Sequence, residues 1–110
     1  MNKFRRRAIF KLIQRLNKLM DSISETSIDL LISEIEEFIN DIQDILDEEE
    51  SVMDNIPENL QSGTIYEKSE DACWNLGDSI SELEDLDVEC TKLDIKNCIS
   101  NVITNLTNCI

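Results

Sequence analysis

Carboxylates and thiols are the side chains of this chain that could do chemistry. The 110 residues include 24 Asp and Glu and four Cys, but no His. Without His the chain cannot form a Ser–His–Asp triad, a Cys–His nucleophile pair, a His-ligated zinc site or the Glu-x-x-His motif of di-iron bundles. It also contains no Gly-rich phosphate loop and no D-x-D-x-D-G calcium loop. We therefore expect a protein that is not an enzyme and that uses no cofactor.

The spacing of the cysteines does not suit a metal site. Sixteen, seven and ten residues separate Cys73, Cys90, Cys98 and Cys109, and no C-x-x-C pair occurs, so a Cys₄ zinc site would require a tertiary coincidence. The N-terminal apolar residues alternate with Lys and Arg and do not form a signal peptide, and no segment approaches a membrane span. We expect a cytoplasmic protein whose thiols are reduced, metal-free and buried as small apolar groups.

Charge is distributed unevenly along the chain. Residues 1–20 contain seven of the ten Lys and Arg and no acidic residue, whereas all 24 acidic residues lie in 21–110, and the net charge is -14. A negative body of this size repels nucleic acid and anionic membranes and favours basic protein partners. We therefore expect neither direct nucleic-acid binding nor membrane binding.

Pro57 and Gly63 mark the hinge of a helical hairpin at residues 54–64. Pro57 cannot continue the acidic helix that precedes it, so that helix must end before the hinge. Gly63 then frees the backbone, and Thr64 with Glu67 has the pattern of a capping box that starts the next helix.

Apolar periodicity predicts helices on both sides of this hinge. Apolar residues recur every three to four positions, and Thr26 with Asp29 and Thr91 with Asp94 repeat the capping-box pattern. These signals predict one all-α domain over 1–110, a small bundle of three or four helices built on an antiparallel hairpin. Its segments are a basic amphipathic helix over 1–23, an acidic helix over 27–52, the hinge, a helix over 64–86 and a C-terminal helix over 91–108.

Two features allow alternative interpretations. The basic helix could lie on anionic lipid or RNA, or its apolar face could join the core while its basic face balances the acidic helices; we favour the second. Trp74 points away from the apolar stripe of its own helix, so it is either covered by the first or last helix, which we favour, or exposed as an anchor for a partner. Gly77, one turn from Trp74, suggests a close approach of another backbone or ring.

A row of acids along the helix over 27–52 is the candidate binding surface. We call Asp29, Glu36, Asp41, Asp44 and Asp47 the acidic row, and Glu48 to Glu50 extend its charge to the hinge. Neighbouring acids rise by about 4.5–10 Å along the helix, a range that brackets the phosphate spacing of nucleic acid. The row is either an ordinary solvated face or an imitation of a phosphate backbone. Asp29, Glu36, Asp41, Asp44, Asp47, Glu48 and Trp74 are the expected partner-binding residues.

The hinge region also resembles known sequences. DEEE at 47–50, DNIPENLQ at 54–61 and YE at 66–67 stand in this order, and this arrangement resembles small uncharacterised acidic helical proteins of phages and bacterial mobile elements. The resemblance covers roughly residues 1–86 in layout and is motif-specific around 47–67. It implies a helical hairpin and a location in the host bacterial cytoplasm, without an activity.

Two functions of different classes follow as hypotheses. The first is an interaction protein of phage or mobile-element type that inhibits a host nucleic-acid-binding defence protein, such as a CRISPR effector nuclease, by occupying its basic nucleic-acid channel. The second is a structural or adaptor helical bundle, which could be a homodimer, without nucleic-acid mimicry. A salt-sensitive complex with a basic nuclease would favour the first, and a concentration-dependent oligomer would favour the second.

Overall fold

The structure, a computed structural model that describes residues 1–110, consists of four α-helices and two short 3₁₀ turns without any strand. This confirms the expected all-α bundle. The elements are α1 (Lys3–Ser22), η1 (Ile23–Glu25), α2 (Ile28–Asp54), η2 (Glu58–Leu60), α3 (Thr64–Glu84) and α4 (Lys92–Thr107).

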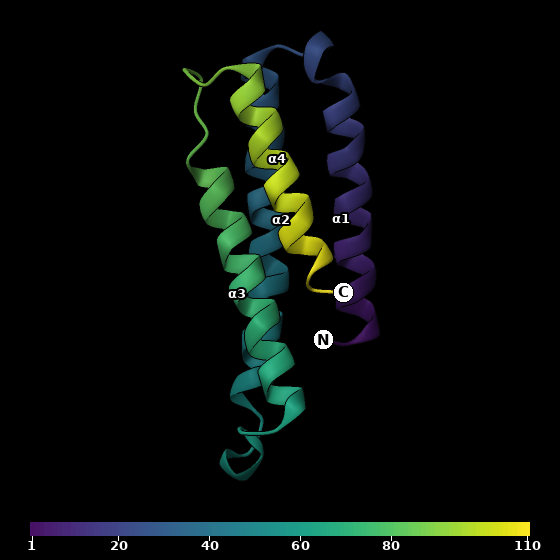
Figure 1. The fold of residues 1–110 in the computed structure, drawn as a ribbon, viewed down its shortest axis with the longest axis vertical. Coiled ribbons are helices and arrows are strands. Elements are labelled where there is room, and N and C mark those ends of the chain that lie inside the picture. Colours follow the sequence, from purple (N-terminus) through teal and green to yellow (C-terminus); the bar gives the residue numbers. More distant parts are fainter.

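The bundle is built on the long antiparallel hairpin of α2 and α3. Helices α4 and α1 pack along this hairpin, with α4 against α3 and α1 against both α4 and α2 (Figure 1). The molecule measures 51 × 22 × 18 Å. Figure 1 shows that the hinge end of the hairpin continues well past the level at which both chain termini lie. The four-helix section therefore ends before the hairpin does.

One apolar core joins all four helices. It comprises 21 buried residues, and α1 with η1 contributes five of them: Ile9, Leu12, Leu16, Leu19 and Ile23. These five belong to the apolar stripe of the basic amphipathic segment, and Ile13 and Met20 of the same stripe pack partly buried against the core, so its apolar face joins the core, as we favoured. The rest come from α2 (Leu31, Ile35, Phe38, Ile42, Ile45, Leu46), α3 (Ala72, Leu76, Ile80, Leu83) and the C-terminal segment (Ile95, Cys98, Ile99, Val102, Leu106, Cys109).

The start of α4 follows the expected capping box. The Thr91 hydroxyl accepts a hydrogen bond from the Asp94 backbone N–H at 3.1 Å, and the Asp94 carboxylate accepts one from the Thr91 N–H at 3.0 Å. This cap stabilises a helix rich in Asn, Ser and Thr, which are poor helix formers, and one buried face then holds it in place.

The two other capping boxes were wrong by one residue each. At α2 the cap is Ser27, whose hydroxyl accepts from the Leu30 N–H at 3.4 Å, because the Thr26 hydroxyl donates instead to the Ser22 carbonyl. At α3 the extended backbone of Gly63 forms the N-cap without a side-chain hydrogen bond, and Thr64 is already helical.

The hinge behaves as Pro57 requires. Helix α2 ends at Asp54, three residues before the proline, and Pro57 itself is extended at ψ 144° before the short turn η2. The Leu60 N–H donates to the Pro57 carbonyl at 2.8 Å, and the Gly63 N–H donates to the Leu60 carbonyl at 3.0 Å. Two successive turns thus reverse the chain and set α3 antiparallel to α2.

Candidate protein-binding surface

Most of the acidic row lies on the solvent side of α2. Asp29, Glu36, Asp44 and Asp47 are exposed, as is Glu48 beside them. None of these five carboxylates forms an ion pair, although Asp47 accepts a hydrogen bond from Gln43 on the same helix at 2.8 Å. These side chains are therefore free to meet an external cation.

Asp41 differs from the other members of the acidic row. It is half-buried, and its carboxylate lies 2.8 Å from Nη1 of Arg15 on α1, whose guanidinium also lies 4.6 Å from the centre of the Phe38 ring. At about 100° per residue Asp41 is rotated by roughly 120° from Asp29, which turns it toward α1. Asp41 therefore belongs to an internal contact and is the row residue least available to a partner.

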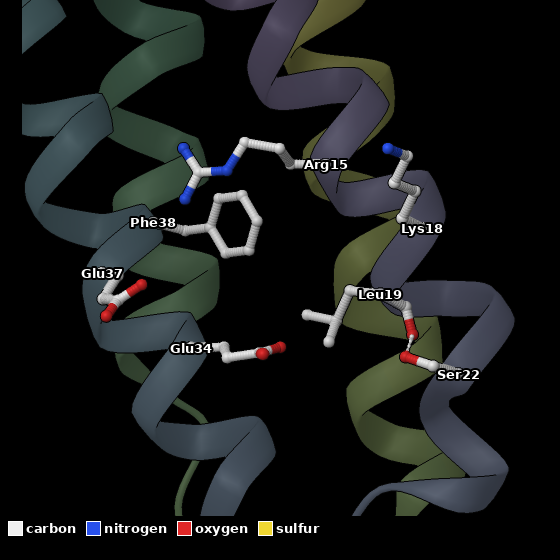
Figure 2. Close-up of a pocket in the computed structure, with 7 residues that line it drawn as sticks. All are labelled: Arg15, Lys18, Leu19, Ser22, Glu34, Glu37 and Phe38. Carbon is white, nitrogen blue, oxygen red and sulfur yellow. Dashed lines mark hydrogen bonds between the residues drawn. The ribbon is translucent and has the colours of Figure 1, made fainter.

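The groove between α1 and α2 is balanced in charge. Figure 2 shows Arg15 and Lys18 on α1 opposite Glu34 and Glu37 on α2, with the Phe38 ring beneath the Arg15 side chain. Farther along the same groove, Lys11 and Arg15 line a second hollow with Asp41 and Asp44. The basic face of α1 thus compensates one flank of the acidic helix, as expected for a core-packed basic helix.

Glu49 was expected to extend the exposed charge, and this was wrong, because it is fully buried. Its carboxylate accepts hydrogen bonds from Arg5 Nε at 2.6 Å and from the Ser69 hydroxyl at 2.7 Å, and the Met1 ammonium lies 3.7 Å away. Glu49 follows the buried Ile42 by seven residues, so it lies on the core face of α2. This ionic cluster joins α1, α2 and α3 where the four-helix section ends.

An uncompensated acidic cleft lies between α2 and α3. We call it the Trp74 cleft; its volume is about 600 Å³, and its lining consists of Glu50, Met53, Asp54, Glu70, Cys73, Trp74, Gly77, Asp78 and Ser81. Four of these residues are acidic and none is basic, in contrast to the groove on the other flank of α2. Trp74 is 68% exposed, so the covered position that we favoured was wrong, and its role as an anchor for a partner stays a prediction.

The Trp74 cleft contains chemistry for holding cations. Its carboxylates attract Lys and Arg, and the face of an exposed indole adds a cation–π contact of about 0.5–1 kcal/mol at such a site. The space beside Gly77 in this cleft is unoccupied, since an added Cβ there would meet no atom within 4 Å. The close approach of another backbone or ring that we expected at Gly77 was therefore wrong.

The structure does not unite Trp74 with the acidic row. No row residue lines the Trp74 cleft, and Glu48 does not either. Sequence reasoning missed Asp54, Glu70 and Asp78 as members of one site. A signal was present, because Glu70, Trp74 and Asp78 follow each other at four-residue spacing and so share a helix face.

The cysteines are all free and act as packing groups. Cys98 donates from its thiol to the Glu82 carbonyl at 3.1 Å, and Cys109 donates to the Ala72 carbonyl at 3.7 Å. Burial raises the pKa of both thiols to about 12, and burial with the nearby Glu49 carboxylate raises the pKa of Cys73 to about 11. Protonated thiols of this kind are weak nucleophiles and weak metal ligands.

No helix combines the length and the apolar character needed to cross a bilayer. Comparison with known proteins gave no relative: neither a protein-family model, nor a curated protein, nor a solved structure matches this chain.

Proposed function

We propose that this chain is an acidic interaction protein that binds the basic, nucleic-acid-binding surface of another protein and thereby blocks that surface. The observation that carries the proposal is the Trp74 cleft, which is lined by Glu50, Asp54, Glu70 and Asp78 together with an exposed tryptophan and by no basic residue. In this cleft a Lys or Arg of the partner would meet both a carboxylate and the indole face.

The exposed acids on the solvent face of α2 form a second acidic surface, separate from the Trp74 cleft, that would act together with it. Among the 24 acidic residues only Asp41 and Glu49 form ion pairs, so the other carboxylates repel one another. A basic partner would supply the missing cations and relieve this electrostatic repulsion. The exposed members Asp29, Glu36, Asp44, Asp47 and Glu48 would steer that partner and contact phosphate-binding Lys and Arg. The partner's nucleic acid would compete for those same cations.

The setting implied by the resemblance suggests which partner to test first. For a protein of phage or mobile-element type in a bacterial cytoplasm, that partner is a host defence nuclease such as a CRISPR effector, whose nucleic-acid channel is lined with cations. Inhibition would then arise by occupation of the channel, without any chemistry on the nuclease.

A binding experiment tests this function. The chain and its Trp74→Ala variant are immobilised and incubated with bacterial lysate, and with a purified guide-loaded CRISPR effector, at low salt and at about 1 M salt, where charges are screened within about 3 Å. We expect capture at low salt, its loss at high salt and weaker capture by Trp74→Ala. Captured proteins must then lose nucleic-acid binding when the free chain is added. Capture that survives high salt, or that leaves nucleic-acid binding unchanged, would contradict the proposal.

A second candidate function is the adaptor bundle, and one observation favours it. Val52, Leu60 and Ile65 at the hinge end are apolar and 41–78% exposed. Exposed apolar residues that gather at one place mark a docking surface more often than single scattered ones do.

A further inference from the structure

We propose that the hinge end of the α2–α3 hairpin is a dimerisation surface that binds the same surface of a second copy of this chain. The inference does not depend on the Trp74 cleft, with which this surface shares no lining residue, and it deepens the second candidate function, which rests on the same exposed apolar residues.

The first argument is that the apolar faces of α2 and α3 continue beyond the part of the hairpin that α1 and α4 cover. Val52 follows the buried Ile45 by seven residues, and Ile65 precedes the buried Ala72 by seven, so both lie on the faces that are covered by α1 and α4 elsewhere. At the hinge end that cover is missing, since Arg5 in the first turn of α1 binds Glu49 and the C-terminal Cys109 reaches only Ala72. Figure 1 shows the hairpin continuing alone beyond both termini.

The second argument is that these residues form one apolar groove. We call it the tip groove; it is lined by Val52, Asn55, Ile56, Pro57, Leu60, Gly63, Thr64 and Ile65, with a volume of about 540 Å³ and without a charged residue. Ile65 is 78% exposed and Leu60 is 56% exposed. An exposed groove of this composition on so acidic a protein gains free energy when another apolar surface covers it.

The third argument concerns charge, and it selects a second copy as the occupant. Where the four-helix section ends, a step is lined by Met1, Arg6, Lys68, Asp71, Ala72, Asn108, Cys109 and Ile110. Arg6 and Lys68 are exposed cations there without an ion pair and outnumber the exposed acid Asp71, whereas Glu58 is an exposed acid at the end of the hairpin. A two-fold axis perpendicular to the hairpin would place the hinge end of each copy against the tip groove and the step of the other copy. In this arrangement Glu58 of one copy approaches Arg6 and Lys68 of the second copy.

The surface is moderate in size. The tip groove and the step are lined by eight residues each, so with Glu58 they supply 17 residues per copy, slightly below the roughly 20–30 residues that a standard interface uses on each side. The Trp74 cleft shares no lining residue with the tip groove or the step, so both clefts would remain open in this arrangement. The dimer would therefore present two acidic clefts to a partner.

Sedimentation velocity and light scattering over a range of protein concentrations test this inference. The test variant is Val52→Ser with Ile65→Ser, and the matched control is Leu30→Ser with Leu93→Ser, because Leu30 and Leu93 are similarly exposed at 60% and 64% but lie at helix starts away from the hinge. We expect a dimer that persists in about 0.5 M salt, a dissociation constant raised by about tenfold or more in the test variant, and no change in the control.

Charge exchange gives an independent readout. Glu58→Lys should weaken the dimer, and adding Arg6→Glu with Lys68→Glu should restore it, while circular dichroism reports an unchanged fold in each variant. A protein that stays monomeric up to millimolar concentration would overturn the proposal. So would a dimer that Val52→Ser with Ile65→Ser leaves intact, or one that dissociates in salt.

Discussion

The buried ionic cluster around Glu49 gives the sharpest prediction about stability. Glu49→Gln keeps the size of the side chain, so it removes charge without opening a cavity. The variant leaves the Arg5 guanidinium without a counter-ion at a position where its side chain is only 10% exposed. The Ser69 hydroxyl, now 2.7 Å from a carboxylate oxygen, would retain a neutral amide as its only nearby acceptor.

The expected cost of Glu49→Gln is about 3 kcal/mol of unfolding free energy. Removing one partner of a buried ion pair typically costs 3–5 kcal/mol, and the slight exposure of Arg5 places this pair toward the lower end. The Arg15–Asp41 pair provides the contrast within the same molecule: its side chains are only partly buried, at 46% and 43% exposed, so it should contribute less than about 1 kcal/mol.

Urea unfolding followed by far-UV circular dichroism measures both effects. A double-mutant cycle adds Arg5→Met, Glu49→Met and the two changes together, and we expect the double variant to be more stable than either of these single variants, because neither the Arg5 nor the Glu49 charge is left buried without the other. A Glu49→Gln variant within about 0.5 kcal/mol of the original chain, or effects of the two single changes that simply add, would refute our description of the cluster.

Other predictions test the packing, the thiols and the cleft. Ile99→Ala and Leu76→Ala, at side chains that are fully buried, should each cost about 2–5 kcal/mol in urea unfolding, and a smaller loss would mean that the core packs differently. Gly77→Ala should raise the unfolding free energy by about 0.5–1 kcal/mol, because the position is helical with open space around it, and a loss of stability would show a close neighbour there. Folding raises the pKa of Cys98 and Cys109 from 9.0 to about 12, so the folded state binds these thiol protons more tightly than the unfolded state does. Their contribution to the unfolding free energy is therefore complete below pH 9 and is lost as the pH rises toward 12. An unfolding free energy that is flat from pH 8 to about 11 would contradict this. The two thiols should also react with a thiol reagent only after unfolding, and fast reaction in the native protein would show that they are accessible.

Much of the fold could be predicted from the sequence because its signals are local. Pro57 cannot continue the helix that precedes it and so marks the end of α2, and a 3.6-residue apolar period identifies the buried face of each helix. Caps were less certain, because neighbouring residues such as Thr26 and Ser27 compete for the same backbone groups and only the folded chain decides between them.

The site was harder to predict, because residue type and helical phase disagreed. Glu49 stands on the core face by phase, yet its place within an acidic run suggested exposure, and the Arg5 that neutralises it lies 44 residues away in sequence. Asp41 turned out to face α1 for the same reason of phase. Trp74 was expected to be covered because large aromatic side chains are usually buried, although its phase already indicated solvent.

The most direct test of the central claim is competition for a basic nuclease with charge reversals at two places. Glu50→Lys with Asp54→Lys changes the Trp74 cleft, and Asp21→Lys with Glu25→Lys makes the same change in net charge at exposed positions near the opposite end of α2. The measured quantity is the concentration of chain that displaces half of the bound nucleic acid from a captured partner, with circular dichroism as the control for folding. We predict a loss of at least about tenfold for the cleft variant and a clearly smaller loss for the control, because position and not only total charge decides a contact at close range. Equal losses in the two variants, or none in either, would contradict the assignment of the Trp74 cleft as the binding surface.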